Sequence, residues 1–202
     1  MITIIDYGMG NLGSVINMFK RIGVVSKITS DLKEIKRAKK ILLPGVGSFD
    51  KAMRKINDSG IKEILDYKVL KEEIPILGIC LGMQLLTKSS EEGVEKGLGY
   101  IDAFTKRFSF QDKKYKVPHM GWNLVEKSTP SELTSDFDEE SKFYFVHSFY
   151  VKVNSEENSI FKTMYGFKFD SAIQYKNIFG AQFHPEKSHK FGMKLLKNFS
   201  KI

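Results

Sequence analysis

Cys80 is the only cysteine in the chain, and the residues around it suit a catalytic nucleophile. It stands in the run Ile76-Leu77-Gly78-Ile79-Cys80-Leu81-Gly82-Met83-Gln84. The apolar residues before it predict a buried parallel strand, and the residues after it can begin a helix. Gly-x-Cys-x-Gly at such a junction is typical of a nucleophile elbow, whose small residues let the chain turn sharply. The helix N-terminus would favour a thiolate and offer N–H groups to an oxyanion. A lone cysteine is usually a small buried apolar residue, but both glycines favour the nucleophile.

His184 is the best candidate among the four histidines for the base that such a nucleophile needs. It ends the apolar run Ile178-Phe179-Gly180-Ala181-Gln182-Phe183, which predicts another strand with His184 at its carboxyl end. Pro185 keeps His184 out of helical conformation. Glu186 can accept a hydrogen bond from the imidazole and fix its tautomer, which completes the nucleophile–base–orienter pattern of hydrolytic triads. Taken alone, His184 would more often be a structural histidine at a strand end, and the pairing with the Cys80 elbow favours the catalytic role.

These two segments together resemble the class I, triad-type glutamine amidotransferases. Four further segments, in the same order and from end to end of the chain, are similar to the glutaminase subunits of imidazole glycerol phosphate synthase. They are Ile5-Asp6-Tyr7-Gly8-Met9-Gly10-Asn11-Leu12, Leu43-Pro44-Gly45-Val46-Gly47-Ser48-Phe49, Pro118-His119-Met120-Gly121-Trp122-Asn123 and Phe143-Tyr144-Phe145-Val146-His147-Ser148-Phe149.

The resemblance implies hydrolysis of L-glutamine to glutamate and ammonia by Cys80, His184 and Glu186. It assigns the oxyanion hole to the N–H groups of Gly47 and Leu81. It also implies that the glycine-rich loop turns into position when the partner's site is filled. In isolation the same loop would be a tight turn after a strand.

Substrate binding is assigned by the same resemblance. Gln84 and Glu92 would bind the α-amino and α-carboxyl ends of glutamine, although Glu91 next to Glu92 leaves the register open by one residue. Ser148 and Phe149 would add main-chain contacts. The family often has threonine and tyrosine at these two positions, so a hydroxyl is lost at Phe149.

The implied partner is a (β/α)8-barrel cyclase subunit that receives the ammonia and makes imidazole glycerol phosphate and an aminoimidazole carboxamide ribonucleotide. The interface residues implied are Asn11, Met120, Trp122 and Lys187. Core packing is the alternative for the single tryptophan. No cofactor and no metal are expected, because one cysteine and no close histidine cluster leave a ligand set incomplete.

Three alternatives stay open at this point. The same glutaminase chemistry could supply a paralogous partner that aminates surface-polysaccharide sugars. A cysteine peptidase or related hydrolase could use a similar sheet, but Gln84 and the Pro-Gly-Val-Gly loop disfavour it. An inactive regulatory module would lack Cys80, His184 or Glu186, and the chain has all three.

Composition and periodicity predict one α/β domain over residues 1–202. Strands at Ile2–Ile5, Ile41–Leu43 and Ile76–Cys80 alternate with amphipathic helices, which predicts a doubly wound, mainly parallel sheet. Short β-rich pieces around 98–126 and 142–184 predict a small antiparallel excursion, and Phe191, Leu195 and Phe199 mark a closing helix.

The net charge and the distribution of apolar residues also indicate which kinds of partner and which cellular compartment to expect. The net charge is +8, but only four of the 32 basic residues are arginine. Proteins that bind the phosphate groups of nucleic acids favour arginine over lysine. We therefore expect a solvated lysine-rich surface and no nucleic-acid partner. The sequence contains no signal peptide and no membrane-spanning run, and a single cysteine fits a reducing compartment. We therefore expect a cytoplasmic protein.

Overall fold

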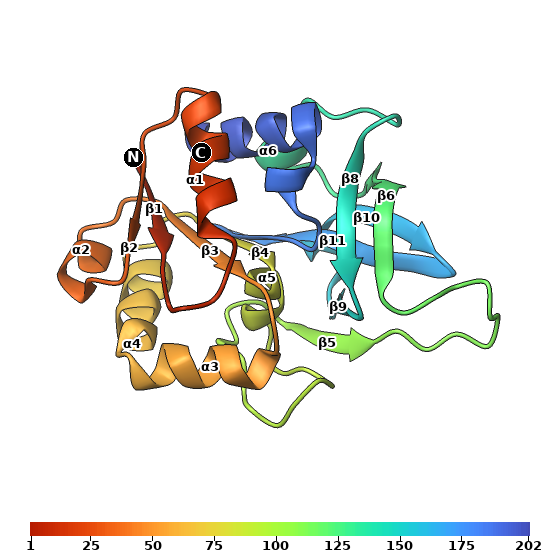
Figure 1. Ribbon diagram of the computed structural model, residues 1–202, viewed down its shortest axis with the longest axis horizontal. Helices are drawn as coiled ribbons and strands as arrows, with labels where there is room; N and C mark the ends of the chain where they lie inside the picture. Colours follow the sequence, from red (N-terminus) through yellow and green to blue (C-terminus); the bar gives the residue numbers. More distant parts are fainter.

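A ten-stranded mixed sheet forms the frame of the computed structural model, which describes residues 1–202 (Figure 1). Its strands follow the order β2-β1-β3-β4-β12-β11-β10-β7, with β9 paired to β11 and β5 to β9. The neighbours from β2 to β12 are parallel, and the remaining pairings are antiparallel. The predicted α/β fold with a parallel core is therefore confirmed, and most of its antiparallel strands extend the same sheet. The bounds are β1 (Ile2–Ile5), β2 (Ser26–Thr29), β3 (Ile41–Gly45), β4 (Ile76–Cys80), β5 (Ala103–Arg107), β7 (Glu126–Lys127), β9 (Phe149–Val153), β10 (Ser159–Tyr165), β11 (Phe167–Tyr175) and β12 (Ile178–Ala181).

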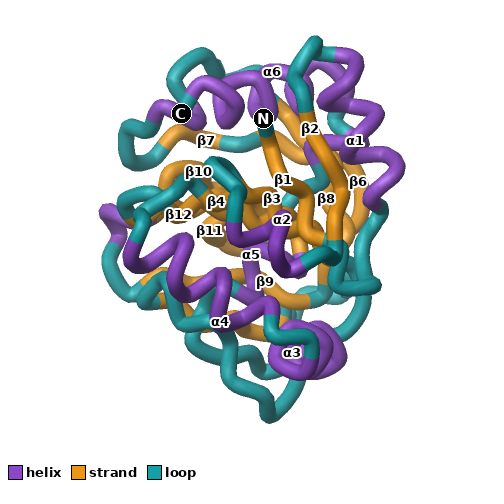
Figure 2. Tube along the Cα trace, turned by 90° about the vertical axis from the view of Figure 1, so that its left-hand side faces the viewer, coloured by secondary structure: helices purple, strands orange, loops and turns teal.

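Helices cover both faces of the parallel strands. In Figures 1 and 2, α1 and α6 lie on one face, and α3 and α4 lie on the other. The side chains of β3 alternate accordingly: Leu42 joins the apolar cluster under α1 and α6, whereas Ile41 and Leu43 join the cluster under α3 and α4. The helical segments are α1 (Leu12–Arg21), α2 (Leu32–Lys36), α3 (Phe49–Asp58), α4 (Ile61–Asp66), α5 (Leu81–Leu85) and α6 (His189–Lys201), with a π-helical turn η1 (Tyr67–Lys71) and the 3-10 turns η2 (Glu132–Thr134), η3 (Glu156–Asn158) and η4 (Pro185–Lys187).

The sequence pattern misses two short elements. Ile41–Leu43, predicted as the second strand, lies in the third, because β2 and α2 precede it. β2 is the edge strand and pairs only with β1, and Thr29 is its one buried residue. α2 buries only Ile35. Neither element therefore shows the apolar periodicity on which a prediction depends.

The turn from β4 into α5 is a close crossing of backbones. Cys80 has φ 53° and ψ −110°, a positive-φ conformation that non-glycine residues rarely adopt. A Cβ on Gly82 would lie 1.9 Å from the carbonyl oxygen of Leu43, and one on Gly78 would lie 2.5 Å from the carbonyl oxygen of Gly82. Both glycines of the elbow are therefore required by contact between main chains.

A separate two-stranded sheet, β6 (His119–Leu124) with β8 (Lys142–His147), stands beside the main sheet. Burial alternates along β6: His119 points inward and is buried, whereas Met120, Trp122 and Leu124 are exposed. The structure contains no helix that is long and apolar enough to span a membrane.

Replacing Gly82 by alanine is expected to lower the free energy of unfolding by more than about 3 kcal/mol, because overpacking commonly costs about 1–3 kcal/mol and here the obstacle is backbone. Denaturant titration followed by circular dichroism measures this. Gly13→Ala is the matched control, because a Cβ there would meet no atom within 4 Å. That change within α1 should leave stability unchanged or raise it by up to about 1 kcal/mol. Equal midpoints for the two variants would contradict the close-crossing account.

Candidate active site

A cavity of about 380 Å³ opens beyond the carboxyl ends of β3, β4 and β12. Ligands of open α/β sheets bind at this edge. The cavity brings together residues that the sequence predicts for three roles: nucleophile and base, oxyanion hole, and substrate binding. These lining residues are Gly47, Cys80, Leu81, Gln84, Glu92, Ser148, Phe149 and His184, and Lys187 from the predicted interface also lines the cavity.

The Cys80 side chain lies at this edge, almost buried. Its Sγ accepts a hydrogen bond from Gln182 Nε2 over 3.8 Å. Gln182 comes from the segment after β12 and is itself buried. Its role was not predicted, because a glutamine after an apolar strand gives no local sign of a contact with residue 80.

The His184 ring is held by Glu186. Nδ1 of His184 lies 2.7 Å from Oε1 of Glu186, and both side chains are buried. Burial by itself would lower the pKa of His184, but the hydrogen bonds and charges of Cys80 and Glu186 outweigh it and raise the pKa to about 10. The imidazole is therefore protonated at neutral pH, and its Nδ1–H donates to the carboxylate. Nε2 of His184 is buried and makes no hydrogen bond of standard geometry within the chain.

The backbone of His184 is fixed by β8 and by a buried serine. The N–H of His184 donates to the Tyr144 carbonyl over 2.9 Å. Ser188 Oγ donates to the His184 carbonyl over 2.6 Å and accepts from the Tyr144 N–H over 3.0 Å. The sequence shows only a serine near the start of a helix, so this role could not be predicted.

The glycine-rich loop after β3 lies beside Cys80. Gly47 has φ 105°, and a Cβ there would lie 2.8 Å from Met9 Cε. Tyr7 anchors the start of the loop, because its hydroxyl donates to the Pro44 carbonyl over 2.7 Å. Leu81 follows Cys80 as the first residue of α5. The two predicted oxyanion donors thus both line the cavity together with Cys80.

Of the two neighbouring acids, Glu92 lines the cavity and Glu91 does not. Oε2 of Glu92 accepts from the Phe49 N–H over 3.0 Å at the start of α3. Burial raises the pKa of Glu92, against the lowering effect of that N–H. Oε2 of Glu91 instead accepts from the Arg107 N–H over 2.7 Å and is exposed.

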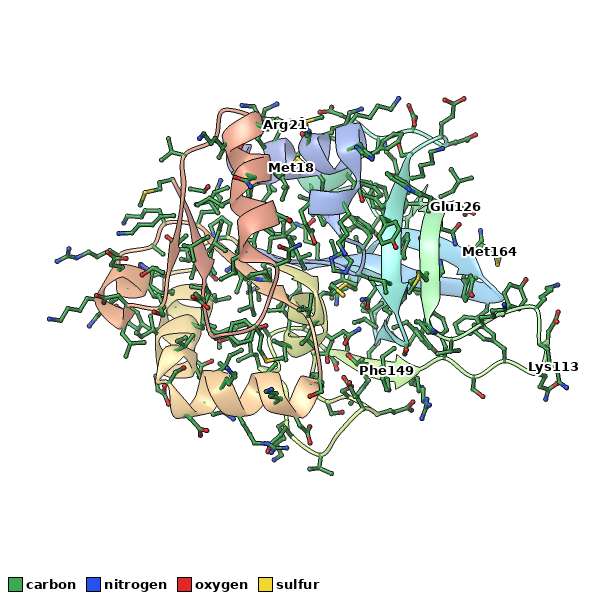
Figure 3. The ribbon with its side chains drawn as sticks, in the orientation of Figure 1. Met18, Arg21, Lys113, Glu126, Phe149 and Met164 are labelled. Atoms are coloured by element: carbon green, nitrogen blue, oxygen red, sulfur yellow. The ribbon has the colours of Figure 1, made fainter.

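Gln84 is buried one helical turn after Cys80. Its Nε2 donates to the Phe149 carbonyl over 3.2 Å and to Gln182 Oε1 over 3.1 Å. Both amide hydrogens are thereby used, which leaves Oε1 as its available polar atom. Figure 3 shows Phe149 next to β5, below the end of β8.

The predicted interface residues lie on the exterior. Met120 is 61% and Trp122 44% exposed, so the core-packing alternative for Trp122 does not hold. The Trp122 and Tyr144 rings contact edge to face with centroids 6.3 Å apart, and Lys187 Nζ lies 5.7 Å from the centroid of Tyr144. Trp122 and Lys187 therefore both lie against the Tyr144 ring, and of these three residues only Lys187 lines the cavity. Asn11 is exposed at the start of α1, where its side chain accepts from the Ser14 N–H over 3.4 Å.

Comparison with known proteins gives the family. Two relatives match over nearly their whole length: imidazole glycerol phosphate synthase subunit HisH 2 of Methanococcus maripaludis at 54% identity (100% of this chain, 99% of that protein) and subunit HisH 2 of Pseudomonas aeruginosa at 46% (100% of both). Two solved structures share the fold. PurLQS from Thermotoga maritima has a TM-score of 0.71 at 17% identity, covering 99% of this chain and 97% of that one. A glutamine amidotransferase has a TM-score of 0.74 at 16% identity, with 100% of both covered. The family model of the class I glutamine amidotransferases matches residues 3–202, and the chain belongs to this family.

Proposed function

We propose that this glutamine amidotransferase is the glutaminase subunit of an imidazole glycerol phosphate synthase, which hydrolyses L-glutamine and delivers the ammonia to a (β/α)8-barrel cyclase. The observation that carries the proposal is the arrangement of Cys80, His184 and Glu186 at one edge of the sheet, facing a cavity with candidate groups for each end of glutamine. The two HisH relatives support the pathway, because they match this chain from end to end.

In the proposed reaction His184 first takes the Cys80 proton, which leaves a thiolate beside an imidazolium. The sulfur of Cys80 attacks the side-chain amide carbon of glutamine, and the N–H groups of Gly47 and Leu81 hold the resulting oxyanion. His184 then gives its Nε2 proton to the leaving nitrogen, so the C–N bond breaks, ammonia departs and a thioester remains. The neutral His184 next takes a proton from water, whose oxygen attacks the thioester and expels the sulfur as glutamate forms. Glu186 keeps Nδ1 protonated throughout, so that Nε2 is the atom that exchanges protons.

Glutamine is proposed to bind with its α-ammonium group toward Glu92. A carboxylate is the complement of an ammonium group, and the partly buried position of Glu92 strengthens the attraction. Gln84 Oε1 would accept from the same ammonium group, and the main chain of Ser148 and Phe149 would contact the rest of the amino-acid end. Because residue 149 is phenylalanine, only its main chain can contribute a hydrogen bond.

The cyclase is proposed to dock on the outer face of β6 near the cavity mouth. Met120 and Trp122 are exposed there, with Leu124 next along the same face, and aromatic residues and methionine are enriched at such interfaces. Lys187, beside Tyr144, can pair with an acid of the partner. Ammonia released at Cys80 then leaves on the side where the partner begins.

A second acceptor would suit the same site, because the lining residues of the cavity are assigned to glutamine and none of them is assigned to an acceptor. The same glutaminase would then supply a paralogous partner that aminates surface-polysaccharide sugars. Ammonia-dependent product formation with each purified candidate partner separates the two acceptors.

Cys80→Ala is expected to abolish glutamine-dependent synthesis by the complex, while ammonium salts still support turnover, because Cys80 acts only in releasing ammonia. Product formation with each nitrogen source measures this. Cys80→Gly should be equally inactive with glutamine but more stable than Cys80→Ala by about 1 kcal/mol, because glycine relieves the positive φ. Glutaminase activity remaining in either variant would show that another group is the nucleophile.

Glu186→Gln is expected to lower the pKa of His184 from about 10, because the substitution removes a negative charge 2.7 Å from the ring. Titration of the ring nitrogens by NMR measures the shift. Glu91→Gln is the matched control, because that carboxylate accepts from the Arg107 N–H and does not line the cavity. An unchanged His184 pKa in Glu186→Gln would contradict the electrostatic role of this carboxylate.

Trp122→Ala is expected to weaken binding of the cyclase by about 2 kcal/mol or more, as for a hot-spot aromatic residue. Calorimetric titration of the two proteins gives the dissociation constant. Val25→Ala is the control, because Val25 is also exposed but lies just before β2, at the other end of the sheet. Equal affinities of the two variants would remove Trp122 from the interface.

A further inference from the structure

We propose that His119 and His147 form a directional hydrogen-bonded pair that positions the Phe149 carbonyl, and through it Gln84, for binding of glutamine. Neither histidine is the nucleophile or the base in the proposed mechanism, although His147 lines the cavity. They are positioning residues, and the inference rests on the proposed function of the cavity.

The direction of hydrogen-bond donation between the two histidines follows from their other partners. Nδ1 of His147 lies 2.7 Å from the Phe149 carbonyl oxygen, which can only accept, so Nδ1 carries the proton. In a neutral ring, Nε2 of His147 is then an acceptor. Nδ1 of His119 lies 2.9 Å from it and must donate. Nε2 of His119 is therefore also an acceptor.

Asn123 fixes the other end. Its Nδ2 lies 3.2 Å from Nε2 of His119 and also donates to the Met164 carbonyl over 3.0 Å. Its Oδ1 accepts from the Leu124 N–H over 2.9 Å. These bonds fix the orientation of the amide, so the NH₂ group faces His119. All donors then point the same way, from Asn123 through both histidines to the Phe149 carbonyl.

The surroundings keep both rings neutral. The His119 ring lies between Tyr165 and Phe145, with centroids at 4.0 and 4.8 Å. Phe108 and Phe169 each lie 5.3 Å from His147. Burial lowers the pKa of His119 to about 4 and is the main cause that lowers that of His147 to about 3. Neutral rings are the state that the directional pair requires.

The pair ends at the substrate-binding side of the cavity. The Phe149 carbonyl accepts from Gln84 Nε2 as well as from His147, and Gln84 Nε2 also donates to Gln182 Oε1. A shift of the His147 ring would therefore move an acceptor that orients Gln84. Because Gln84 Oε1 is proposed to contact glutamine, the expected effect is on substrate binding more than on the chemical step.

The first readout is the tautomer in the wild-type chain, which does not depend on any activity. Long-range ¹H–¹⁵N NMR spectra at about pH 7 should show both His119 and His147 as neutral rings protonated at Nδ1. A ring protonated at Nε2, or an imidazolium at either position, would overturn the proposal.

The second readout separates KM from kcat in the glutaminase reaction of the complex. His119→Phe keeps an aromatic ring between Phe145 and Tyr165 but removes the donor to His147. The KM for glutamine should rise about fivefold to tenfold, as expected for one lost hydrogen bond, with kcat within about threefold. His119→Asn places an amide N–H near the Nδ1 position and should bring KM back to within about twofold of wild type.

Controls separate positioning from loss of stability. Phe137→Leu alters a buried ring cluster with Phe143 and Phe161, so it should lower the melting temperature without changing KM. If His119→Phe does not fold, Asn123→Ala removes the other anchor and should raise KM in the same direction. An unchanged KM in the folded variant, or no recovery in His119→Asn, overturns the proposal. A wild-type complex that hydrolyses no glutamine would instead refute the proposed function and leave the tautomer result to stand by itself.

Discussion

The close crossing of β4 and α5 over β3 is the constraint on which the site depends. It holds Cys80 at positive φ, a strain of about 1–3 kcal/mol that the parallel pairing of Gly45 with Cys80 and the glycine contacts maintain. β4 also lies between β3 and β12 in the sheet. The sulfur therefore emerges between the loop that carries Gly47 and the turn that carries His184. Sheet order alone places the nucleophile between its proposed oxyanion donor and its base.

The same residue type has opposite proton affinities within this small region. His184 faces a carboxylate and a cysteine, and its pKa is raised to about 10. Burial lowers the pKa of His147 to about 3, although the hydrogen bond to the Phe149 carbonyl opposes this effect. The charge of His184 adds to the lowering at His147. The two rings therefore differ in proton affinity because only His184 has a carboxylate as its hydrogen-bond partner.

The sequence predicted the parts of the fold and site whose conformation is determined by a few neighbouring residues. The Gly78–Gly82 elbow, the turn at His184 and the apolar face of α3 are each encoded within a few residues, and the structure forms all three. Ser188, Gln182 and the His119–His147 pair were not predicted, because each acts through a partner 28 or more residues away. β2 and α2 were missed for a different reason: each buries a single residue, so their positions are set by neighbours and not by periodicity.

The small β6–β8 sheet connects the proposed docking face with two segments of the cavity. Its outer face carries Met120 and Trp122. Residues of β8 hold two segments that line the cavity, one at His184 and one at Phe149. Tyr144 holds the backbone of His184 directly and through Ser188. His147 holds the Phe149 carbonyl. This sheet shares no ladder with the main one. It is tied to the main sheet through side chains, because Asn123 of β6 donates to the Met164 carbonyl of β10. The base and the substrate-binding segment are therefore both held by the small sheet, whereas Cys80 is held by the parallel strands of the main sheet.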